Sequence, residues 1–224
     1  MLDFVFDGFK QREITVADVG AGTGISSRLL AARGATVIAI DPNAEMLRAA
    51  DVCEGVHYQH GAAEATNLPD ESVDIVTAFQ ALHWFARDEA MREFHRILKR
   101  PGRVAFAWNN RDRTNPFDTA YANLVQTFGE EARIIDSGKN VAPVEKPLEQ
   151  YGFSAVTKGV FYHEQRLNRD GIIGRARSTS YLPQEGPEFE RLREALVSLH
   201  RQFADAKGFV RFAYRTVAYR GDLR

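Results

Sequence analysis

The sequence predicts an α/β fold built on a parallel, doubly wound sheet. Short apolar runs rich in β-branched residues alternate with segments of helical periodicity, and few residues connect them. The run 36–40 is apolar throughout, which is typical of a strand buried on both faces of a sheet. The run 14–19 leads directly into a glycine-rich turn and then a helical pattern. This alternation favours parallel strands joined by helices.

Composition and charge narrow the classes of protein to consider. At 224 residues the chain fits one domain with a sizeable core. Its formal net charge is -1, so it lacks the broad basic field that binds nucleic acid or anionic membranes. No apolar run approaches the ~20 residues of a membrane span, and the first residues do not form a secretion signal. We therefore expect a cytoplasmic protein without nucleic-acid or membrane partners, either monomeric or homodimeric. The single cysteine excludes an internal disulfide.

The first half of the chain predicts its elements in regular alternation. Apolar residues at helical spacing indicate a short helix at 2–11. Asn43 can cap a helix in which Met46 faces inward, and Pro101-Gly102 predicts a turn. The other expected elements are strands at 14–19, 36–40, 56–59, 73–79 and 103–108, and helices at 25–33 and 87–99.

The second half of the chain is less regular. Asn115-Pro116 begins a helix that Gly129 ends, because proline suits a first helical position and glycine the residue after the last. Pro187 begins another helix, which Gly208 ends. The other expected elements are a loop at 130–147, strands at 153–167 and 209–219, and a helix at 169–181.

The glycine turn after the first strand indicates a binding site. A strand, a glycine-rich turn and a helix N-terminus together form a backbone cradle for a polar or charged ligand. Gly20, Gly22 and Gly24 follow the pattern G-x-G-x-G, whereas dinucleotide folds hold a pyrophosphate with G-x-G-x-x-G. Asp18 lies two residues before the first glycine. A carboxylate pointing into the cradle would repel a pyrophosphate but suit a ligand with an ammonium group.

Five motifs relate the chain to a known family. They are Asp18-Val-Gly-Ala-Gly-Thr-Gly24, Asp41-Pro-Asn-Ala-Glu-Met46, Gly61-Ala-Ala-Glu64 with Leu68-Pro69, Asp74-Ile-Val-Thr-Ala-Phe-Gln-Ala-Leu-His-Trp-Phe85, and Leu98-Lys-Arg-Pro-Gly102. Through them the chain resembles the class I S-adenosylmethionine-dependent methyltransferases of type 11, in the small-molecule branch typified by trans-aconitate methyltransferase. The resemblance covers most of the chain, from Ala17 to Gly221.

The resemblance implies the order of strands in the sheet and a cofactor-binding half and a substrate-side half of the chain. The expected sheet is Rossmann-like and seven-stranded, in the order 3-2-1-4-5-7-6, with the last strand antiparallel beside the fifth. One methyltransferase domain is expected over 1–224, with a cofactor-binding half at 1–112 and a substrate-side half at 113–224.

The strand ends predict where the ligand binds. In an open α/β sheet, ligands bind beyond the carboxyl ends of the strands, where the strand order reverses. Asp18 and the glycines end the first strand, and Asp41 ends the second. The segments 61–64 and 80–85 follow the third and fourth strands. These segments are therefore expected to converge on one crevice.

The resemblance assigns roles in that crevice, with S-adenosylmethionine as cofactor and S-adenosylhomocysteine as product. The glycine turn approaches the methionyl portion, Asp18 binds its ammonium group, and Asp41 accepts hydrogen bonds from the ribose hydroxyls. Ala62 replaces an aspartate with which the family often binds the adenine amino group, so Glu64 or a backbone carbonyl must substitute. The cofactor-binding residues expected are Asp18, Gly20, Ala21, Gly22, Gly24, Asp41, Pro42, Met46, Ala63, Glu64 and Gln80.

The segment 80–85 is expected to form the wall of the methyl-transfer chamber. Methyl transfer from a sulfonium mainly requires alignment of the acceptor, and a carboxylate acceptor needs no strong base. His83 is a candidate base or hydrogen-bond partner of the acceptor, or else a structural residue beside Trp84. Arg111 is a candidate for binding an acidic acceptor bidentately, as are Arg113, Arg175 and Arg177, although solvated arginines are the commoner case. The expected substrate residues are His83, Trp84 and Arg111.

Other functions stay open at this point. A nicotinamide-dependent Rossmann oxidoreductase is disfavoured by the glycine spacing and by Asp18. Nothing in the sequence excludes a protein that binds S-adenosylmethionine without catalysis. His57 and His60 have no further ligands nearby, so no metal is expected. The family normally has a longer N-terminal segment over the cofactor, so a reduced or trimmed lid is expected. Arg103 replaces the second glycine of a family motif and is expected to affect only a turn.

Overall fold

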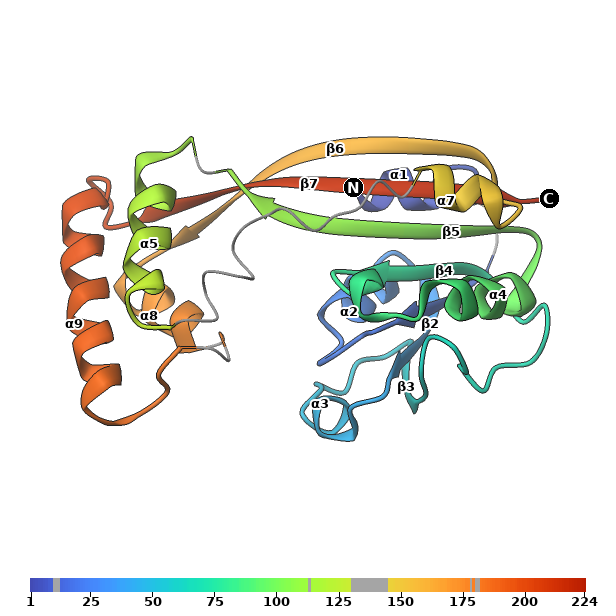
Figure 1. Cartoon of the computed structure of the whole chain (residues 1–224), viewed down its shortest axis with the longest axis horizontal. Helices are drawn as coiled ribbons and strands as arrows, with labels where there is room; N and C mark the ends of the chain where they lie inside the picture. Colours follow the sequence, from blue (N-terminus) through green and yellow to red (C-terminus); the bar gives the residue numbers. More distant parts are fainter. Residues whose placement is uncertain (10–12, 113, 130–144, 178, 180–181) are drawn as a thin grey trace. The chain divides into compact units, whose positions relative to one another are not determined.

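The structure is a computed structural model that describes residues 1–9, 13–112, 114–129, 145–177, 179 and 182–224 (Figure 1). Most of the loop expected at 130–147 lies outside these residues, as do Arg113 and the end of the helix expected at 169–181. The helices are α1 (Leu2–Phe6), α2 (Ile25–Ala31), α3 (Ala44–Arg48), α4 (Arg87–Ile97), α5 (Pro116–Gln126), α7 (Glu145–Gln150), α8 (Arg169–Arg177) and α9 (Gly186–Phe203), with a 3-10 turn η1 at Leu82–Trp84.

The strands form one mixed sheet among the described residues. They are β1 (Ile14–Val19), β2 (Ala35–Asp41), β3 (Val56–His60), β4 (Val73–Phe79), β5 (Leu98–Arg111), β6 (Ser154–Leu167) and β7 (Val210–Leu223). The order is β3-β2-β1-β4-β5-β7-β6, with β1 to β5 parallel and β7 antiparallel, so the expected fold class and strand order are confirmed. None of the described helices combines the length and apolar character needed to span a membrane.

Several elements differ from the sequence prediction. Helix α7 was not predicted and begins inside the loop expected at 130–147, and β5 and β7 continue past their predicted ends. Helix α1 ends at Phe6, and its pattern does not continue to Phe9 as a helix. Strand β5 begins at Leu98, before the start predicted at 103, and includes the predicted turn residues Pro101-Gly102. The pairing with β4 shifts along this stretch: Val73 lies opposite Leu98, but Ile75 lies opposite Arg103. The extra residues of β5 therefore interrupt its regular pairing with β4, as a bulge or a similar irregularity.

The chain divides into two compact units. The first consists of Met1–Trp108, Val141–Val160 and Val217–Arg224, and the second of Asn109–Asn140 and Phe161–Thr216. The functional division expected at residue 112 stays a prediction, because compactness does not say which part binds substrate.

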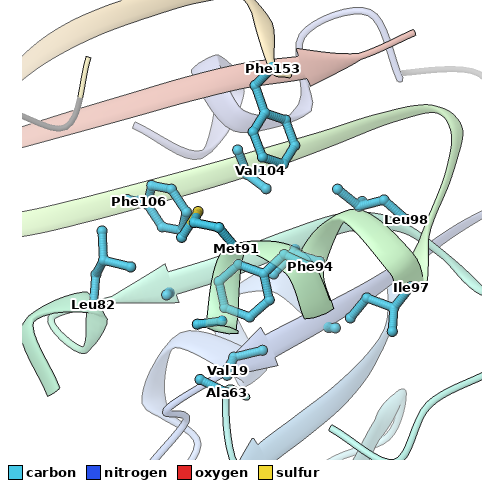
Figure 2. Close-up of a cluster of buried hydrophobic side chains, with 14 of the residues drawn as sticks. Val19, Ala63, Leu82, Met91, Phe94, Ile97, Leu98, Val104, Phe106 and Phe153 are labelled. Carbon is cyan, nitrogen blue, oxygen red and sulfur yellow. The ribbon is translucent and has the colours of Figure 1, made fainter. Parts of the chain in front are cut away.

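The first unit buries both faces of its sheet. Along β1, Ala17 and Val19 pack in a cluster that includes α4, whereas Ile14 and Val16 pack in a cluster that includes α1 and α2. This alternation is what a doubly wound sheet requires. Figure 2 shows the cluster around α4, where the labelled side chains are Val19, Ala63, Leu82, Met91, Phe94, Ile97, Leu98, Val104, Phe106 and Phe153.

The second unit has its own apolar core. Helices α5, α8 and α9 bury one face each, and the ends of β6 and β7 in this unit complete the core. Phe212 lies at its centre, with ring centroids of Phe117 and Tyr121 each 4.9 Å away. The core residues are Phe117, Tyr121, Val125, Ile172, Ala176, Leu182, Leu192, Leu196, Leu199, Val210, Phe212 and Tyr214.

Arg103 ties three parts of the first unit together, so the expectation that it affects only a turn is wrong. The side chain is 7% exposed, and its Nε donates to Asp222 Oδ1 in β7 at 2.6 Å. Its Nη1 donates to the carbonyl oxygens of Val5 at 2.9 Å and Asp7 at 2.6 Å. The guanidinium also lies 5.0 Å from the centroid of the Phe9 ring. The fork of donors on a guanidinium suits this junction, which glycine could not supply.

Replacing Arg103 with methionine should lower the free energy of unfolding by about 2–4 kcal/mol, since each buried group left unsatisfied costs about 1–3 kcal/mol. Urea unfolding measures this change. Arg100→Met is the matched control on the same strand, because Arg100 is half exposed and its ion pair with Glu71 is 3.8 Å long. That control should cost at most about 1 kcal/mol. Equal losses in the two variants would contradict the role given to Arg103.

Candidate functional site

A cavity of about 430 Å³ lies at the carboxyl ends of β1 to β4 in the first unit. Its size falls in the usual range for small-molecule sites. The turns after these four strands all contribute to it, as the topology predicts. The lining residues are Gly20, Gly22, Asp41, Pro42, Asn43, Met46, Ala62, Ala63, Glu64, Gln80, Ala81, Trp84 and Phe85.

The carboxylate of Asp41 is held rigidly at the end of β2. Its Oδ2 accepts from the backbone N–H of Gly22, and its Oδ1 accepts from that of Asn43, both at 2.8 Å. A carboxylate has about four lone-pair sites, so two amide bonds leave acceptor capacity for a ligand's hydroxyl groups. Because one of the amides belongs to the glycine turn, the ends of β1 and β2 are fixed to one another.

The glycine turn bends over the end of β1 in a conformation that requires glycine. Gly20, Gly22 and Gly24 have φ values of 73°, 57° and 76°, in the left-handed region. A Cβ at Gly20 would lie 2.4 Å from the Cβ of Ala81, and one at Gly24 would lie 2.3 Å from the Tyr58 hydroxyl. A Cβ at Gly22 would meet nothing within 4 Å, since this residue faces the open cavity.

Two other residues of the predicted glycine turn are buried and do not line the cavity. Ala21 is 7% exposed, and its N–H, like that of Gly20, donates to the carbonyl oxygen of Ile40. Gly24 is buried at the N-terminus of α2. Both residues therefore shape the turn, and their contact with a ligand stays a prediction.

Asp18 does not point into the cavity as the sequence argument supposes. The side chain is 1% exposed, and its Oδ2 accepts from the hydroxyls of Ser26 and Ser27, both at 2.7 Å. Its Oδ1 accepts from Thr77 Oγ1 of β4 at 2.8 Å. Burial raises the pKa of Asp18, and the three hydroxyl bonds oppose that shift. The carboxylate thus stabilises the glycine turn through its bonds to α2 and β4. Binding of an ammonium group by Asp18 stays a prediction.

The turn after β3 carries the third lining segment. Ala62, Ala63 and Glu64 line the cavity, and Glu64 Oε1 accepts from the backbone N–H of Ala86, which caps α4, at 2.6 Å. Further along this turn, the backbone N–H of Thr66 donates to Glu93 Oε1 of α4 at 2.9 Å. This segment is therefore anchored to α4 at two points.

The segment after β4 lines the cavity with aromatic surface, as expected for the chamber wall. Trp84 is 78% exposed and Phe85 half-buried, and both line the cavity. His83 is exposed and is not among the lining residues. Partial desolvation lowers the pKa of His83, which favours the neutral imidazole. Its role as a base stays a prediction.

Helix α3 brings an exposed methionine to the opposite rim. The Asn43 side chain caps α3 as predicted, accepting from the backbone N–H groups of Glu45 and Met46. The prediction that Met46 faces inward is wrong: it is 46% exposed and lines the cavity beside Pro42. The apolar face of this short helix is turned toward a ligand site instead of the core.

The charge of the lining decides which ligand class fits. Asp41 and Glu64 are its charged members, and none of the thirteen lining residues is a lysine or arginine. S-adenosylmethionine carries a sulfonium, an ammonium and a carboxylate, so its net charge is positive and suits this lining. A dinucleotide would place a pyrophosphate beside two carboxylates, which argues against a nicotinamide oxidoreductase.

The chain matches known methyltransferases over nearly its whole length. A protein family described as "Methyltransferase domain" matches residues 17–106 of the chain. An uncharacterised methyltransferase of Mycobacterium tuberculosis is 43% identical over 217 residues, covering 93% of this chain and 83% of that protein. Another, of Schizosaccharomyces pombe, is 31% identical over 231 residues, covering 97% and 87%. This chain belongs to the class I S-adenosylmethionine-dependent methyltransferases.

Solved structures show the same fold. A structure named as a type II methyltransferase, from Anaeromyxobacter dehalogenans, has a TM-score of 0.64 at 23% identity, covering 93% of this chain and 89% of that chain. The YcgJ protein of Bacillus subtilis has a TM-score of 0.55 at 21% identity, covering 95% and 92%. The cofactor of this methyltransferase is S-adenosylmethionine.

The remaining predicted substrate residue, Arg111, belongs to the second unit of the methyltransferase. Its guanidinium lies 5.4 Å from the centroid of the Tyr121 ring. Asp118 is 1% exposed, and burial raises its pKa to about 6, although the positive charges of Arg111 and Arg175 oppose that rise. Arg175 in turn lies 4.8 Å from the Phe212 ring centroid. The second unit thus holds two guanidinium groups near one buried carboxylate.

Several site residues were missed by sequence reasoning. Asn43 lines the cavity, and its position directly after Asp41-Pro42 was the available signal. Ser26, Ser27 and Thr77 hold Asp18, and no motif marks them as its partners. No group of three or more histidine, cysteine, aspartate or glutamate side chains in the described part of the chain could hold a metal ion.

Replacing Asp41 with alanine should weaken S-adenosylmethionine binding by about 1–3 kcal/mol, because the ribose hydroxyls would lose their acceptor. Calorimetric titration measures this as a fall in affinity of about 5- to 150-fold. Glu45→Ala is the matched control: Glu45 is an exposed carboxylate four residues away that does not line the cavity. The control should keep wild-type affinity. Unchanged binding by the Asp41 variant would show that Asp41 does not hold the ribose.

Proposed function

We propose that this methyltransferase methylates a small organic acid of metabolite size, with a carboxylate oxygen as the nucleophile. One observation carries the proposal: among the residues that the structure describes, the cavity lining includes no histidine, lysine, cysteine or tyrosine. Its two carboxylates both accept hydrogen bonds from backbone amides. A cavity without an available base suits an acceptor that is already ionised at neutral pH, as a carboxylate is.

The residues that would hold the cofactor follow from the lining. Asp41 would accept from the ribose hydroxyls, and Pro42 and Met46 would contact the adenine. The Ala63 backbone amide would donate to an adenine ring nitrogen, and Glu64 would accept from the adenine amino group. The glycine turn would lie against the methionyl portion, with Asp18 bracing it.

The chemistry then requires little from the protein besides alignment. The bound cofactor supplies an activated methyl group, whose bond to sulfur breaks as its bond to the acceptor oxygen forms, leaving a neutral thioether and a methyl ester. No proton moves in this step. Holding the acceptor oxygen in line contributes on the order of 7–11 kcal/mol to lowering the barrier. Trp84 and Phe85 would exclude water from that position, which strengthens the attraction between carboxylate and sulfonium.

A methyl-transfer screen tests the proposal. Mono-, di- and tricarboxylic acids, phenols and amines are offered with S-adenosylmethionine, and S-adenosylhomocysteine release is measured against a reaction without acceptor. Turnover should be confined to acids and should stay level from pH 6 to 9, since carboxylates are fully ionised above about pH 6. Turnover confined to amines, or a rate that rises tenfold per pH unit, would contradict a carboxylate acceptor.

A further inference from the structure

The carboxylate of Glu93 in α4 holds the loop that follows β3. Its side chain is 10% exposed, and its Oε1 accepts from the backbone N–H of Thr66 at 2.9 Å and from the Thr66 hydroxyl at 2.5 Å. Arg96 donates to both oxygens of the same carboxylate, through Nη2 to Oε1 at 2.7 Å and through Nε to Oε2 at 2.8 Å. Four donors from two residues therefore converge on one carboxylate.

Arg96 extends this connection further along the loop. Its Nη2 also donates to the carbonyl oxygen of Leu68 at 2.8 Å, and its Nη1 donates to Asp70 Oδ1 at 2.5 Å. Burial alone would raise the pKa of Glu93, but the hydrogen bonds from Arg96 and Thr66 outweigh it and lower that pKa. The ionised carboxylate is thus favoured. Because it is shielded from solvent, it fixes the loop more firmly than an exposed ion pair would.

The turn 62–65 is held in place through Thr66, the residue that follows it. The turn is closed by two backbone bonds, from Ala62 N–H to Ala65 at 3.2 Å and from Ala65 N–H to Ala62 at 3.1 Å. Thr66 is fully buried, and its carbonyl oxygen accepts from Gln59 Nε2 of β3 at 2.7 Å. Thr66 is therefore fixed between β3 and α4, and it fixes one end of the turn.

This turn brings its residues to the cavity on the side where the proposed function places the adenine. Ala62, Ala63 and Glu64 line the cavity, whereas Thr66 and Glu93 are not among the lining residues. The bond from Ala86 N–H to Glu64 Oε1 also joins the turn to α4, but it is exposed to solvent. The buried connection through Glu93 is the firmer of the two.

We infer that Glu93 is a positioning residue for recognition of the cofactor's base. By holding Thr66, it fixes the turn so that the Ala63 backbone N–H and the Glu64 carboxylate offer the adenine one donor and one acceptor at a set spacing. This inference rests on the adenine placement in the proposed function. Groups fixed in advance discriminate well between bases, because a mismatched base leaves them unpaired. Glu93 thus sets base specificity without touching the cofactor.

S-adenosylhomocysteine and S-inosylhomocysteine test the inference by calorimetric titration. Hypoxanthine has a carbonyl where adenine has its amino group, and a protonated ring nitrogen where adenine has an acceptor. The wild type should prefer the adenine ligand by about tenfold or more, and Glu93→Ala should reduce that preference to about threefold or less. General loss of stability would weaken both ligands alike, so it would leave the preference unchanged.

A second variant tests whether Glu93 acts through Thr66. Thr66→Val keeps the shape of the side chain but removes the hydroxyl that donates to Glu93, so the preference for adenine should fall by about threefold. This variant also carries the test if Glu93→Ala does not fold. The double variant should lose no more preference than Glu93→Ala alone, because residues that act as one unit are not additive.

Glu89→Ala is the matched control. Glu89 is an exposed carboxylate one turn earlier on α4, and its replacement should leave the preference at the wild-type value. An unchanged preference in Glu93→Ala, or in Thr66→Val, would overturn the inference. A double variant that loses clearly more than Glu93→Ala would overturn the route through Thr66. A wild type that bound both ligands alike would instead refute the adenine placement in the proposed function, and the inference would fall with it.

Discussion

The buried carboxylate of Asp18 is the constraint on which the cofactor site depends. It accepts hydrogen bonds from two serine hydroxyls of α2 and from Thr77 of β4, so it joins the end of β1 to its helix and to the neighbouring strand. A buried carboxylate is stable only when its oxygens are satisfied, and here three hydroxyls satisfy them. The glycine turn between β1 and α2 is therefore held at both ends.

The same rigidity extends to Asp41 and to the rest of the cavity. One Gly22 amide connects the turn to the Asp41 carboxylate, and the close approach of Ala81 to Gly20 connects it to the segment after β4. Four strand ends thus hold four short segments around one cavity. The charged residues in its described lining, Asp41 and Glu64, are both acidic. Such preorganisation suits a reaction in which the protein mainly aligns its reactants.

Elements whose bounds follow from burial of apolar residues were predicted well from the sequence. Elements whose bounds depend on pairing between strands were predicted less well. Strands buried on both faces are largely apolar runs, so β1, β2 and β4 were recognisable. The start of β5 was not recognisable, because Pro101-Gly102 predicts a turn before the strand, and only the pairing of Leu98 with Val73 shows that the strand begins earlier. Asp41 ends β2, as the sequence predicted. The direction of the Asp18 carboxylate was not predictable, because one of its partners is 59 residues away.

The central claim is that an anionic cavity at these strand ends accepts a cationic nucleoside and rejects a pyrophosphate. Calorimetric titration of the full chain with S-adenosylmethionine and, separately, with NADH tests it most directly. The account predicts one equivalent of S-adenosylmethionine bound per chain and no heat of binding with NADH. Saturable binding of NADH, or none of S-adenosylmethionine, would contradict it.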